Sequence, residues 1–315
     1  MENCSAITVM VGIPGSGKTE MAKYLLKNAE NTVYISSDEI RKEIFGDDRD
    51  QSDNVRVFNI FYDKLKRALK DGKNALLDAT NTSMKARKHV FETAKSLKKL
   101  VNVTAFVMNT NPMVCLERNA KRERVVPQEA IERMLCNYQH PQYFEGFDDI
   151  VFANNFTHIN TEKISGYFSQ MRSFDQNNHH HAYPLLEHCV KLAQQYPVGS
   201  IEYEAGIWHD IGKLFTRKND DEGVSHYYGH ANYGAYLLAS NLDMFMSQDK
   251  DKIQEIIFYV NYHMMAHYDI TTEKSIKKYT EIFGKERLDR LFDFALKDKI
   301  ATGTWVPDEK QEDKL

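Results

Sequence analysis

The 315-residue sequence is poor in the residues that mark fibrous, disordered or disulfide-rich chains. It holds 15 glycines and 7 prolines, too few for a collagen-like or low-complexity chain. Its four cysteines, Cys4, Cys115, Cys136 and Cys189, are scattered and form no CxxC pair. Neither a disulfide framework nor a thiolate zinc site is indicated, so a reducing cytoplasm is the expected location.

Long hydrophobic runs are also missing. No apolar stretch reaches the roughly 18–20 residues that a membrane span needs, and no basic patch leads into an apolar core at the N-terminus. We therefore expect no membrane contact and no export signal. The formal net charge is only −4, which excludes a general polyanion-binding surface, so any nucleic acid has to contact a local groove.

The pattern of apolar residues changes along the chain. Strand-like runs alternate with amphipathic stretches up to about residue 160, as in a parallel sheet flanked by helices. Long helical patterns then continue to about residue 304. A chain of this length is expected to form two domains. The expected strands are 6–11, 32–35, 75–77, 101–108 and 150–152. The expected divisions are an α/β P-loop domain at 1–160, a linker at 161–174, an all-α domain at 175–305 and a polar tail at 306–315.

Residues 12–19, Gly-Ile-Pro-Gly-Ser-Gly-Lys-Thr, fit the GxxxxGK[ST] pattern between an expected strand and an expected helix. In such a loop, backbone N–H groups and the helix N-terminus face phosphate oxygens. Lys18 would reach the β- and γ-phosphates, and the Thr19 hydroxyl would bind Mg²⁺. The pattern predicts that ATP or another NTP binds with Mg²⁺ at Gly12, Gly15, Ser16, Gly17, Lys18 and Thr19.

The residues around this loop favour a kinase over a switch GTPase, because no NKxD motif follows the strand expected at 101–108. A kinase needs a base at the acceptor hydroxyl and arginines at the transferred phosphoryl group. Asp38 follows an expected strand, where α/β sheets present residues to ligands, and Arg41 lies on the same helical face. Arg118 and Arg122 form a basic pair at i,i+4. The alternatives are a helix N-terminal carboxylate for Asp38 and a solvated charged face for the arginine pair.

Together these segments resemble the 5′-hydroxyl polynucleotide kinases of the phage end-healing type. The resemblance rests on GIPGSGKT, SSDEIR, LLDATN and ERNAKRERVVP. It implies that Asp38 is the general base for the 5′-OH and that Arg41 binds the neighbouring phosphate. It also implies that Asp78 orders the acceptor side and that Arg122, supported by Arg118, is a lid arginine on the donor phosphates. Small-metabolite kinases share much of this pattern.

Histidine is concentrated in the second half, where nine of the twelve lie between residues 179 and 267. An adjacent pair, His209 and Asp210, falls inside an apolar helical run. Charged groups there need a partner, and imidazole and carboxylate can share a metal ion. A packed polar dipeptide is the alternative for the pair alone. The set that strengthens the metal interpretation lies on successive expected helices and comprises His188, His230, His263 and Asp298.

The order H…HD…H…H…D resembles the HD-domain metal-dependent phosphohydrolases over about residues 174–304. Mn²⁺, Ni²⁺, Co²⁺ or Fe²⁺ suits such N and O ligands better than a thiol-bound Zn²⁺ does. Two ions would activate water and clamp the phosphate oxygens of a phosphoester, and Lys213 would stabilise the phosphate. The resemblance implies two metal sites that share Asp210, one on His188, His209, Asp210 and Asp298 and the other on His230, His263 and Asp210.

Several histidines keep more than one interpretation on the sequence alone. His226 and His267 each lie four residues from a chosen ligand, so they are alternatives to His230 and His263. The three consecutive histidines at 179–181 precede the first ligand helix. They either cap the site and contact substrate or belong to a surface loop.

A kinase and a phosphohydrolase would cancel each other on one substrate atom, so their fusion favours action on different ends of a broken strand. Cleaved RNA carries a 2′,3′-cyclic phosphate and a 5′-OH, whereas a ligase needs a 3′-OH and a 5′-phosphate. The sequence therefore predicts a bifunctional enzyme that heals RNA or DNA ends for a separate ligase. The runner-up is a nucleotide-metabolism enzyme that joins a small-molecule kinase to an HD nucleotidase. A third class, a nucleotide-gated binding protein with degenerate sites, would require a lost ligand, and no ligand is missing.

Overall fold

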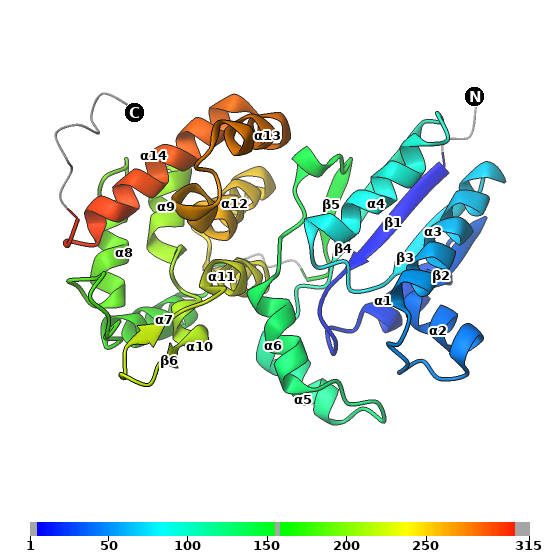
Figure 1. The fold of residues 1–315 in the computed structure, drawn as a ribbon, viewed down its shortest axis with the longest axis horizontal. Coiled ribbons are helices and arrows are strands. Elements are labelled where there is room, and N and C mark those ends of the chain that lie inside the picture. Colours follow the sequence, from blue (N-terminus) through cyan, green and yellow to red (C-terminus); the bar gives the residue numbers. More distant parts are fainter. Residues whose placement is uncertain (1–4, 155–157, 306–315) are drawn as a thin grey trace. The chain divides into compact units, whose positions relative to one another are not determined.

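The computed structural model describes residues 5–154 and 158–305 and divides into two units, Met1–Asn155 and Phe156–Leu315 (Figure 1). Each unit has its own buried apolar core. The division falls slightly before residue 160, where the strand pattern of the sequence was expected to end. The expected polar tail, 306–315, lies outside the described residues.

The N-terminal unit is built on a five-stranded parallel sheet, as the sequence predicts (Figure 1). The strand order is β2-β3-β1-β4-β5, with β1 in the centre. In β1, Val9 pairs with Leu77 on one side and with Ala105 on the other. The strands are β1 (Ser5–Val11), β2 (Thr32–Ser36), β3 (Asn74–Asp78), β4 (Val101–Val107) and β5 (Asp149–Phe152).

Helices follow the strands of this unit and bury their apolar faces. In α3 the fully buried Val57, Phe61 and Leu65 recur every four residues, so one face packs into the core. The side chain of Ser36 accepts a hydrogen bond from the backbone N–H of Glu39 and caps α2. The helices are α1 (Lys18–Leu26), α2 (Ser37–Phe45), α3 (Asn54–Lys70), α4 (Met84–Lys95), α5 (Pro112–Ala120), α6 (Gln128–Cys136) and the short 3₁₀ helix η1 (Tyr143–Glu145).

A buried ion pair joins α4 to the segment before β5. The guanidinium of Arg87, fully buried, donates from Nε and Nη2 to the two carboxylate oxygens of Glu145, at 2.8 and 2.7 Å. Nη1 donates to the carbonyl oxygen of Asn81 at 2.9 Å. Because both charges are desolvated, each depends on its partner for compensation.

The C-terminal unit is helical, with two additions to the expected all-α pattern. The segment expected as a linker, 161–174, is mostly the helix α7, which packs against α8 and has Met171 as its buried residue. Two short strands also form an antiparallel pair where only helices were expected. The elements are α7 (Thr161–Arg172), α8 (Leu185–Ala193), α9 (Ile201–Trp208), α10 (Lys213–Thr216), β6 (Lys218–Asn219), β7 (Ser225–His226), α11 (His230–Ala239), the 3₁₀ helix η2 (Leu242–Met244), α12 (Lys250–Tyr268), α13 (Glu273–Phe283) and α14 (Lys285–Ala301).

Two glycines let the central helices of this unit approach closely. A Cβ on Gly212 would lie 2.0 Å from the carbonyl oxygen of His230, so no side chain fits there. A Cβ on Gly206 would lie 3.0 Å from the backbone of Ala193, a contact tighter than real Cβ atoms usually make. Helix α9 therefore lies close to α8, and the segment that leads into α10 lies close to α11.

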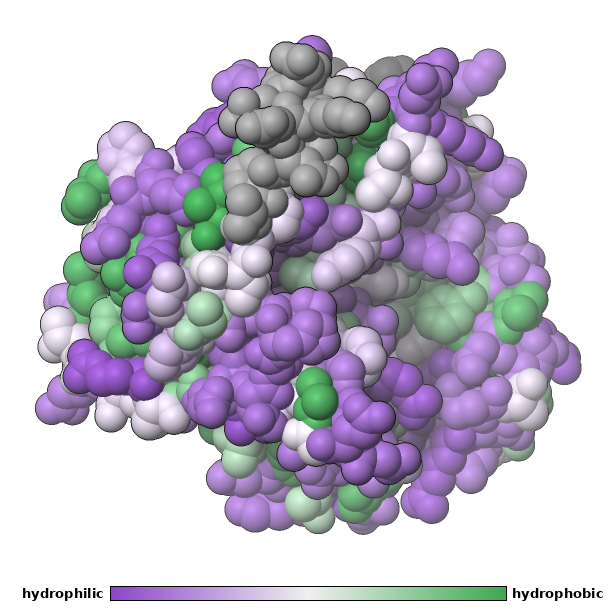
Figure 2. All heavy atoms as spheres, turned by 60° about the vertical axis from the view of Figure 1, so that its left-hand side comes forward, coloured by the Kyte–Doolittle hydropathy of each residue, from purple (hydrophilic) through white to green (hydrophobic). Residues whose placement is uncertain are grey.

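The surface and the helices agree with the lack of long apolar runs in the sequence. Figure 2 shows a face that is largely hydrophilic, with hydrophobic residues scattered in small groups. Within the described ranges, no helix has the length and apolar character needed to cross a membrane.

We expect Glu145→Ala to destabilise the N-terminal unit by about 3–5 kcal/mol, because it leaves the guanidinium of Arg87 buried without its counter-charge. The control is Glu43→Ala, which removes a surface pair with Lys64 (2.7 Å) and should cost no more than about 1 kcal/mol. Chemical denaturation followed by circular dichroism measures both. Equal losses in the two variants would contradict a special role for the buried pair.

Candidate functional site

The P-loop connects the C-terminal end of β1 to the N-terminus of α1, and two of its glycines are required by backbone geometry. Gly15 and Gly17 have φ angles of +80° and +89°, in the left-handed region. A Cβ on Gly15 would also lie 2.1 Å from the carbonyl oxygen of Cys115. Lys18 donates from Nζ to the carbonyl oxygen of Ile13 at 3.0 Å, so its ammonium lies across the loop.

Thr19 and Asp78 are in direct contact. The Thr19 hydroxyl donates to Asp78 Oδ2 at 2.8 Å, and the Tyr34 hydroxyl donates to the same oxygen at 2.7 Å. Asp78 ends β3, the neighbour of β1, which brings its carboxylate to the P-loop. The resemblance placed Asp78 on the acceptor side. In the structure its carboxylate lies against the hydroxyl that is expected to bind Mg²⁺.

Asp38 and Arg41 lie together at the start of α2, directly after β2. Arg41 donates from Nη1 to Asp38 Oδ1 at 2.9 Å and from Nη2 to Asn54 Oδ1 at 2.8 Å. The side chain of Asp38 is about half exposed, whereas Arg41 is buried. Within the described residues Arg41 Nε is buried without a hydrogen-bond acceptor. The pair thus places the accessible carboxylate of Asp38 beside the buried guanidinium of Arg41.

Arg118 and Arg122 approach the P-loop. The position of a Cβ on Gly17 would be 3.7 Å from Arg118 Nη1. Burial lowers the pKa of Lys18 and the charge of Arg122 lowers it further, whereas the carboxylates of Asp78 and Asp38 oppose this shift. These groups are therefore close enough to interact electrostatically with the Lys18 ammonium.

Arg124 was not predicted from the sequence. Its Nη1 lies 3.4 Å from Asp38 Oδ1 and 3.5 Å from Asp48 Oδ2. It follows α5 in the same charged run as Arg122, and spacing alone cannot tell which arginine of that run turns toward Asp38. Asp38 consequently contacts two guanidinium groups, those of Arg41 and Arg124.

Four buried ligand atoms from three parts of the helical unit lie close together. Nε2 of His188, on α8, is 3.2 Å from Nε2 of His209, 3.3 Å from Asp210 Oδ2 and 3.1 Å from Asp298 Oδ1, on α14. Nε2 of His209 is 3.2 and 3.3 Å from the same two oxygens. Ligand atoms about 2.1 Å from one metal ion are roughly 3.0–3.4 Å apart, so the spacing fits a shared ion.

The other oxygen of Asp210 belongs to a second group. His230 Nε2 lies 3.0 Å from Asp210 Oδ1 and 3.3 Å from His263 Nε2. His263 Nε2 lies 3.8 Å from Asp210 Oδ1. Asp210 therefore lies between two histidine pairs, which is the bridging position that the HD-domain resemblance implies.

All four histidines are oriented by their other ring nitrogen. Since a carbonyl oxygen only accepts, Nδ1 carries the proton and the lone pair of the neutral ring is on Nε2. In the first group, against the effect of burial, the carboxylates of Asp210 and Asp298 raise the pKa of His188 to about 9 and that of His209 well above its usual range. Without a metal ion these two rings are therefore protonated, and a divalent ion would replace those protons. The Nδ1 partners are the carbonyls of Ala301 for His188 (3.2 Å), Gly206 for His209 (2.9 Å), Tyr227 for His230 (2.7 Å) and Val260 for His263 (2.9 Å).

The carboxylates of the cluster are ionised. Burial alone would raise the pKa of Asp210, but the charges of His209 and Lys213 hold it well below its usual range. The pKa of Asp298 is lowered in the same way, against burial, by His209 and by hydrogen bonds from neighbouring histidines. The buried Oδ1 of Asp298 faces the Nε2 atoms of His188 and His209, at 3.1 and 3.3 Å. This donor set of imidazoles and carboxylates therefore fits a divalent ion.

The alternative ligands have other partners. His226 Nε2 lies 2.9 Å from Asp220 Oδ2 in the β6–β7 hairpin. His267 Nε2 lies 3.0 Å from Asp298 Oδ2, on the far side of that carboxylate from the ligand cluster. The structure thus groups His230 and His263 with Asp210, and it places His267 where it orients Asp298.

Lys213 is buried beside Asp210, with partners that were not predicted from the sequence. Its Nζ lies 2.7 Å from Asp210 Oδ2, 2.8 Å from Gln176 Oε1 and 3.1 Å from His181 Nε2. Burial, with the nearby charges of Lys213 and His188, lowers the pKa of His181 to about 3, so its ring is neutral and accepts from Lys213. Of the three consecutive histidines, only His181 reaches this cluster.

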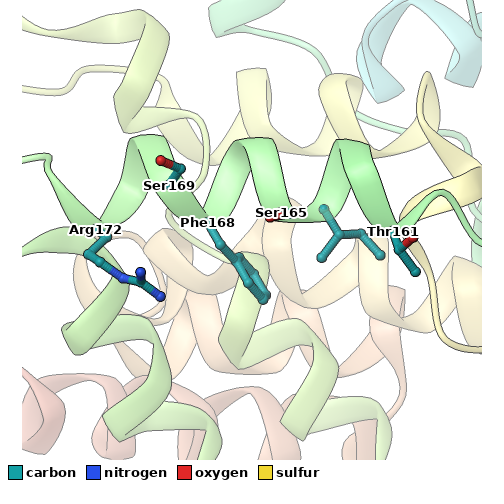
Figure 3. Close-up of a pocket in the computed structure, with 6 residues that line it drawn as sticks. Thr161, Ser165, Phe168, Ser169 and Arg172 are labelled. Atoms are coloured by element: carbon teal, nitrogen blue, oxygen red, sulfur yellow. The ribbon is translucent and has the colours of Figure 1, made fainter.

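A shallow pocket lies elsewhere, along one face of α7 (Figure 3). Figure 3 shows Phe168 pointing toward the helices beneath α7, and its ring stacks on Trp208 with centroids 5.0 Å apart. We assign this groove to helix packing because Arg172 is its only ionisable lining group. The pocket is lined by Thr161, Ile164, Ser165, Phe168, Ser169 and Arg172.

A comparison with protein-family models finds a match in the N-terminal unit. Residues 7–141 match the model of the AAA domain family AAA_33. No curated protein matches the chain. The parallel sheet, the P-loop and this match agree on an α/β P-loop domain in the N-terminal unit.

Among solved structures, a chain of the Pnkp1/Rnl/Hen1 RNA repair complex is 24% identical, with a TM-score of 0.39, and the match covers 42% of this chain and 44% of that one. A fungal RNA kinase is 15% identical (TM-score 0.37; 51% and 80% covered). A gluconokinase from Sinorhizobium meliloti 1021 is 16% identical (TM-score 0.33; 48% and 82% covered). The chain therefore spans less than half of the RNA repair chain that it matches.

We expect the two histidine groups to lose metal separately. His209→Ala should remove the ion between His188 and Asp298, whereas His263→Ala should remove only the ion beside His230. His226→Ala is the matched control, because its ring contacts Asp220 and no ligand atom of the cluster. Elemental analysis after loading with Mn²⁺ measures the number of metal ions bound by the wild type and by each variant. A His209→Ala protein with the full wild-type content would exclude the four-atom site.

Proposed function

We propose that the chain is a bifunctional end-healing enzyme of nucleic acids, most directly of RNA. Its N-terminal unit phosphorylates 5′-OH ends from ATP, and its helical unit removes a 2′,3′-cyclic or 3′ phosphate. The observation that carries the proposal is the presence, in one chain, of a P-loop beside the Asp38–Arg41 pair and of the cluster centred on Asp210. The HD-type assignment of the helical unit belongs to this proposal, since the family match ends at residue 141.

In the kinase reaction the chain's own residues bind the donor and deprotonate the acceptor. The glycines of the P-loop and Lys18 bind the phosphates, and Thr19 and Asp78 would hold Mg²⁺, which supplies positive charge beside the transferred group when bound. Asp38, accessible and held by Arg41, accepts the proton of the attacking hydroxyl. Arg118, whose guanidinium lies near Gly17, and Arg122 stabilise the negative charge of the transferred phosphoryl group.

Arg41 gives the kinase its preference for a polynucleotide. A 5′-terminal nucleotide carries a phosphodiester next to the reacting hydroxyl, and the guanidinium of Arg41, which contacts Asp38, is a donor suited to that phosphate. Arg124, which also contacts Asp38, adds a second positive charge at this position. A metabolite acceptor without such a phosphate would have no use for this arrangement.

In the helical unit the histidines and carboxylates would hold one or two ions of Mn²⁺, Ni²⁺, Co²⁺ or Fe²⁺. Such ions lower the pKa of water and polarise a phosphoester. The residues of the chain do the rest. Asp210 would offer one oxygen to each histidine pair, the backbone carbonyls fix the imidazoles, and Lys213, next to Asp210, offers a positive charge to a phosphate oxygen.

The two chemistries fit together on a broken strand. Phosphorylation and phosphate removal act on opposite ends, so neither undoes the other, and their products are the ends that a ligase joins. We therefore place the enzyme immediately before a separate ligase. The second candidate, a small-molecule kinase fused to an HD nucleotidase, shares both sites and differs in its acceptor, which makes the acceptor the deciding measurement.

We expect Asp38→Asn to reduce 5′ phosphorylation by about 10²–10⁴-fold, because an amide cannot accept the proton. Phosphate release from the other end should stay near wild type, since Asp38 belongs to the other unit. Asp48→Asn is the matched control: Asp48 also contacts Arg124 but not Arg41. The assay follows both ends of an oligonucleotide that bears a 5′-OH and a 2′,3′-cyclic phosphate, with ATP, Mg²⁺ and Mn²⁺. Loss of both activities in Asp38→Asn would contradict the two-site assignment.

Arg41→Ala should raise the KM for oligonucleotide acceptors about ten- to a hundredfold, as expected for a lost bond to a charged group of about 1.5–3 kcal/mol. The KM for ATP should change little. Arg56→Ala, which removes an exposed arginine at the start of α3, should alter neither constant. An unchanged oligonucleotide KM in Arg41→Ala would favour the metabolite-kinase alternative.

A further inference from the structure

Two segments of the helical unit form a rim beside Lys213, residues 177–181 and the β6–β7 hairpin. The backbone N–H of Ser225 donates to the carbonyl of Asn177 at 3.0 Å, and Asn177 Nδ2 donates to the carbonyl of Gly223 at 2.8 Å. At one end of the rim His181 contacts Lys213. At the other end the carbonyl of Tyr227 accepts from His230. The rim is therefore fixed to both parts of the candidate metal cluster.

An exposed aromatic pair lies on this rim. The Tyr228 residue is 74% exposed, and its ring is parallel to that of His226, with centroids 5.6 Å apart and 2° between the planes. His226 is held in turn by Asp220, which also accepts hydrogen bonds from the backbone N–H groups of Glu222 and Val224. A large ring kept in place on one face and open on the other is the arrangement on which nucleobases stack.

The backbone next to Tyr228 connects its ring to the candidate metal ligand His230 and to Lys213. Tyr228 stands between Tyr227, whose carbonyl orients the ligand His230, and Gly229, which caps α11 in a left-handed conformation. The buried ring of Tyr227 lies under Lys213, 5.5 Å from its Nζ. Within one short segment, Tyr227 thus orients His230 and contacts Lys213, while Tyr228 exposes its ring.

We infer that Tyr228, supported by His226, is a nucleobase platform that makes the phosphohydrolase centre selective for nucleotides over phosphoesters without a base. The inference rests on the proposed function of the helical unit and adds the substrate feature that it recognises. The base stacks on the outer face of Tyr228, and its phosphate extends toward Lys213 and the two histidine groups.

The test compares two phosphate monoesters, adenosine 3′-monophosphate and glycerol 2-phosphate, with full-length protein and Mn²⁺. We expect wild type to prefer the nucleotide in kcat/KM, and Tyr228→Ala to lose about tenfold of that preference through KM, as base–aromatic stacking predicts. Tyr228→Trp should keep the preference, which shows that the hairpin tolerates substitution. Tyr24→Ala, which removes an exposed tyrosine of the N-terminal unit, is the control for unspecific loss of aromatic surface.

Equal preference in wild type and Tyr228→Ala would overturn the platform. Binding of adenosine 3′-monophosphate, measured by calorimetry with Mn²⁺ present, separates this failure from that of the proposed function. If wild type binds the nucleotide and Tyr228→Ala binds it about tenfold more weakly, but neither probe is hydrolysed, the platform holds and the assigned reaction is wrong. Equal affinity of the two proteins overturns the platform whatever the reaction.

Discussion

The helical unit depends on the position of Asp210. Its two carboxylate oxygens lie 3.0 to 3.3 Å from imidazole nitrogens of two different histidine pairs, whose opposite ring atoms donate to backbone carbonyls. The charge of the buried carboxylates has to be balanced, and without a metal ion protons on His188 and His209 balance it, since the pKa values of both rings are raised against the effect of burial. The close approach of helices at Gly206 and Gly212 brings the groups together, so packing supplies a geometry in which a divalent ion can replace those protons.

The phosphate site of the N-terminal unit is built differently from the cluster around Asp210. Its phosphate site is made of backbone, since Gly15 and Gly17 adopt left-handed conformations and Gly15 passes within contact of Cys115. The side chains come from the ends of neighbouring strands: β1 leads into the P-loop, β3 ends at Asp78 and β2 ends just before Asp38. Parallel order therefore collects the donor-side and acceptor-side groups at one edge of the sheet, as is general for α/β folds.

Those parts of the fold and of the sites that depend on a short stretch of sequence could be predicted. The five strands were located to within one or two residues because each is a short apolar run bounded by polar turns, and the P-loop because its glycines and lysine have a fixed spacing. The histidine and carboxylate cluster was expected from a family resemblance, but other contacts between distant segments could not be predicted. Thr19 and Asp78 are 59 residues apart, Arg124 is one of several arginines in its run, and the helix at 161–172 has a weak apolar pattern in which Met171 is the one buried residue. These features are set by tertiary packing.

The ligand atoms of the two sites also determine whether the sites compete for the same metal ion. Thr19 and Asp78 offer oxygen, which suits a hard, partly hydrated Mg²⁺ ion beside phosphates. The cluster around Asp210 offers four imidazole nitrogens, which suit first-row transition ions and bind Mg²⁺ poorly. Because the same ion would not satisfy both sets, each unit would select its own cofactor from a mixture. One chain would then run phosphorylation and phosphate removal together without competition for metal, as the repair of both ends of one break requires.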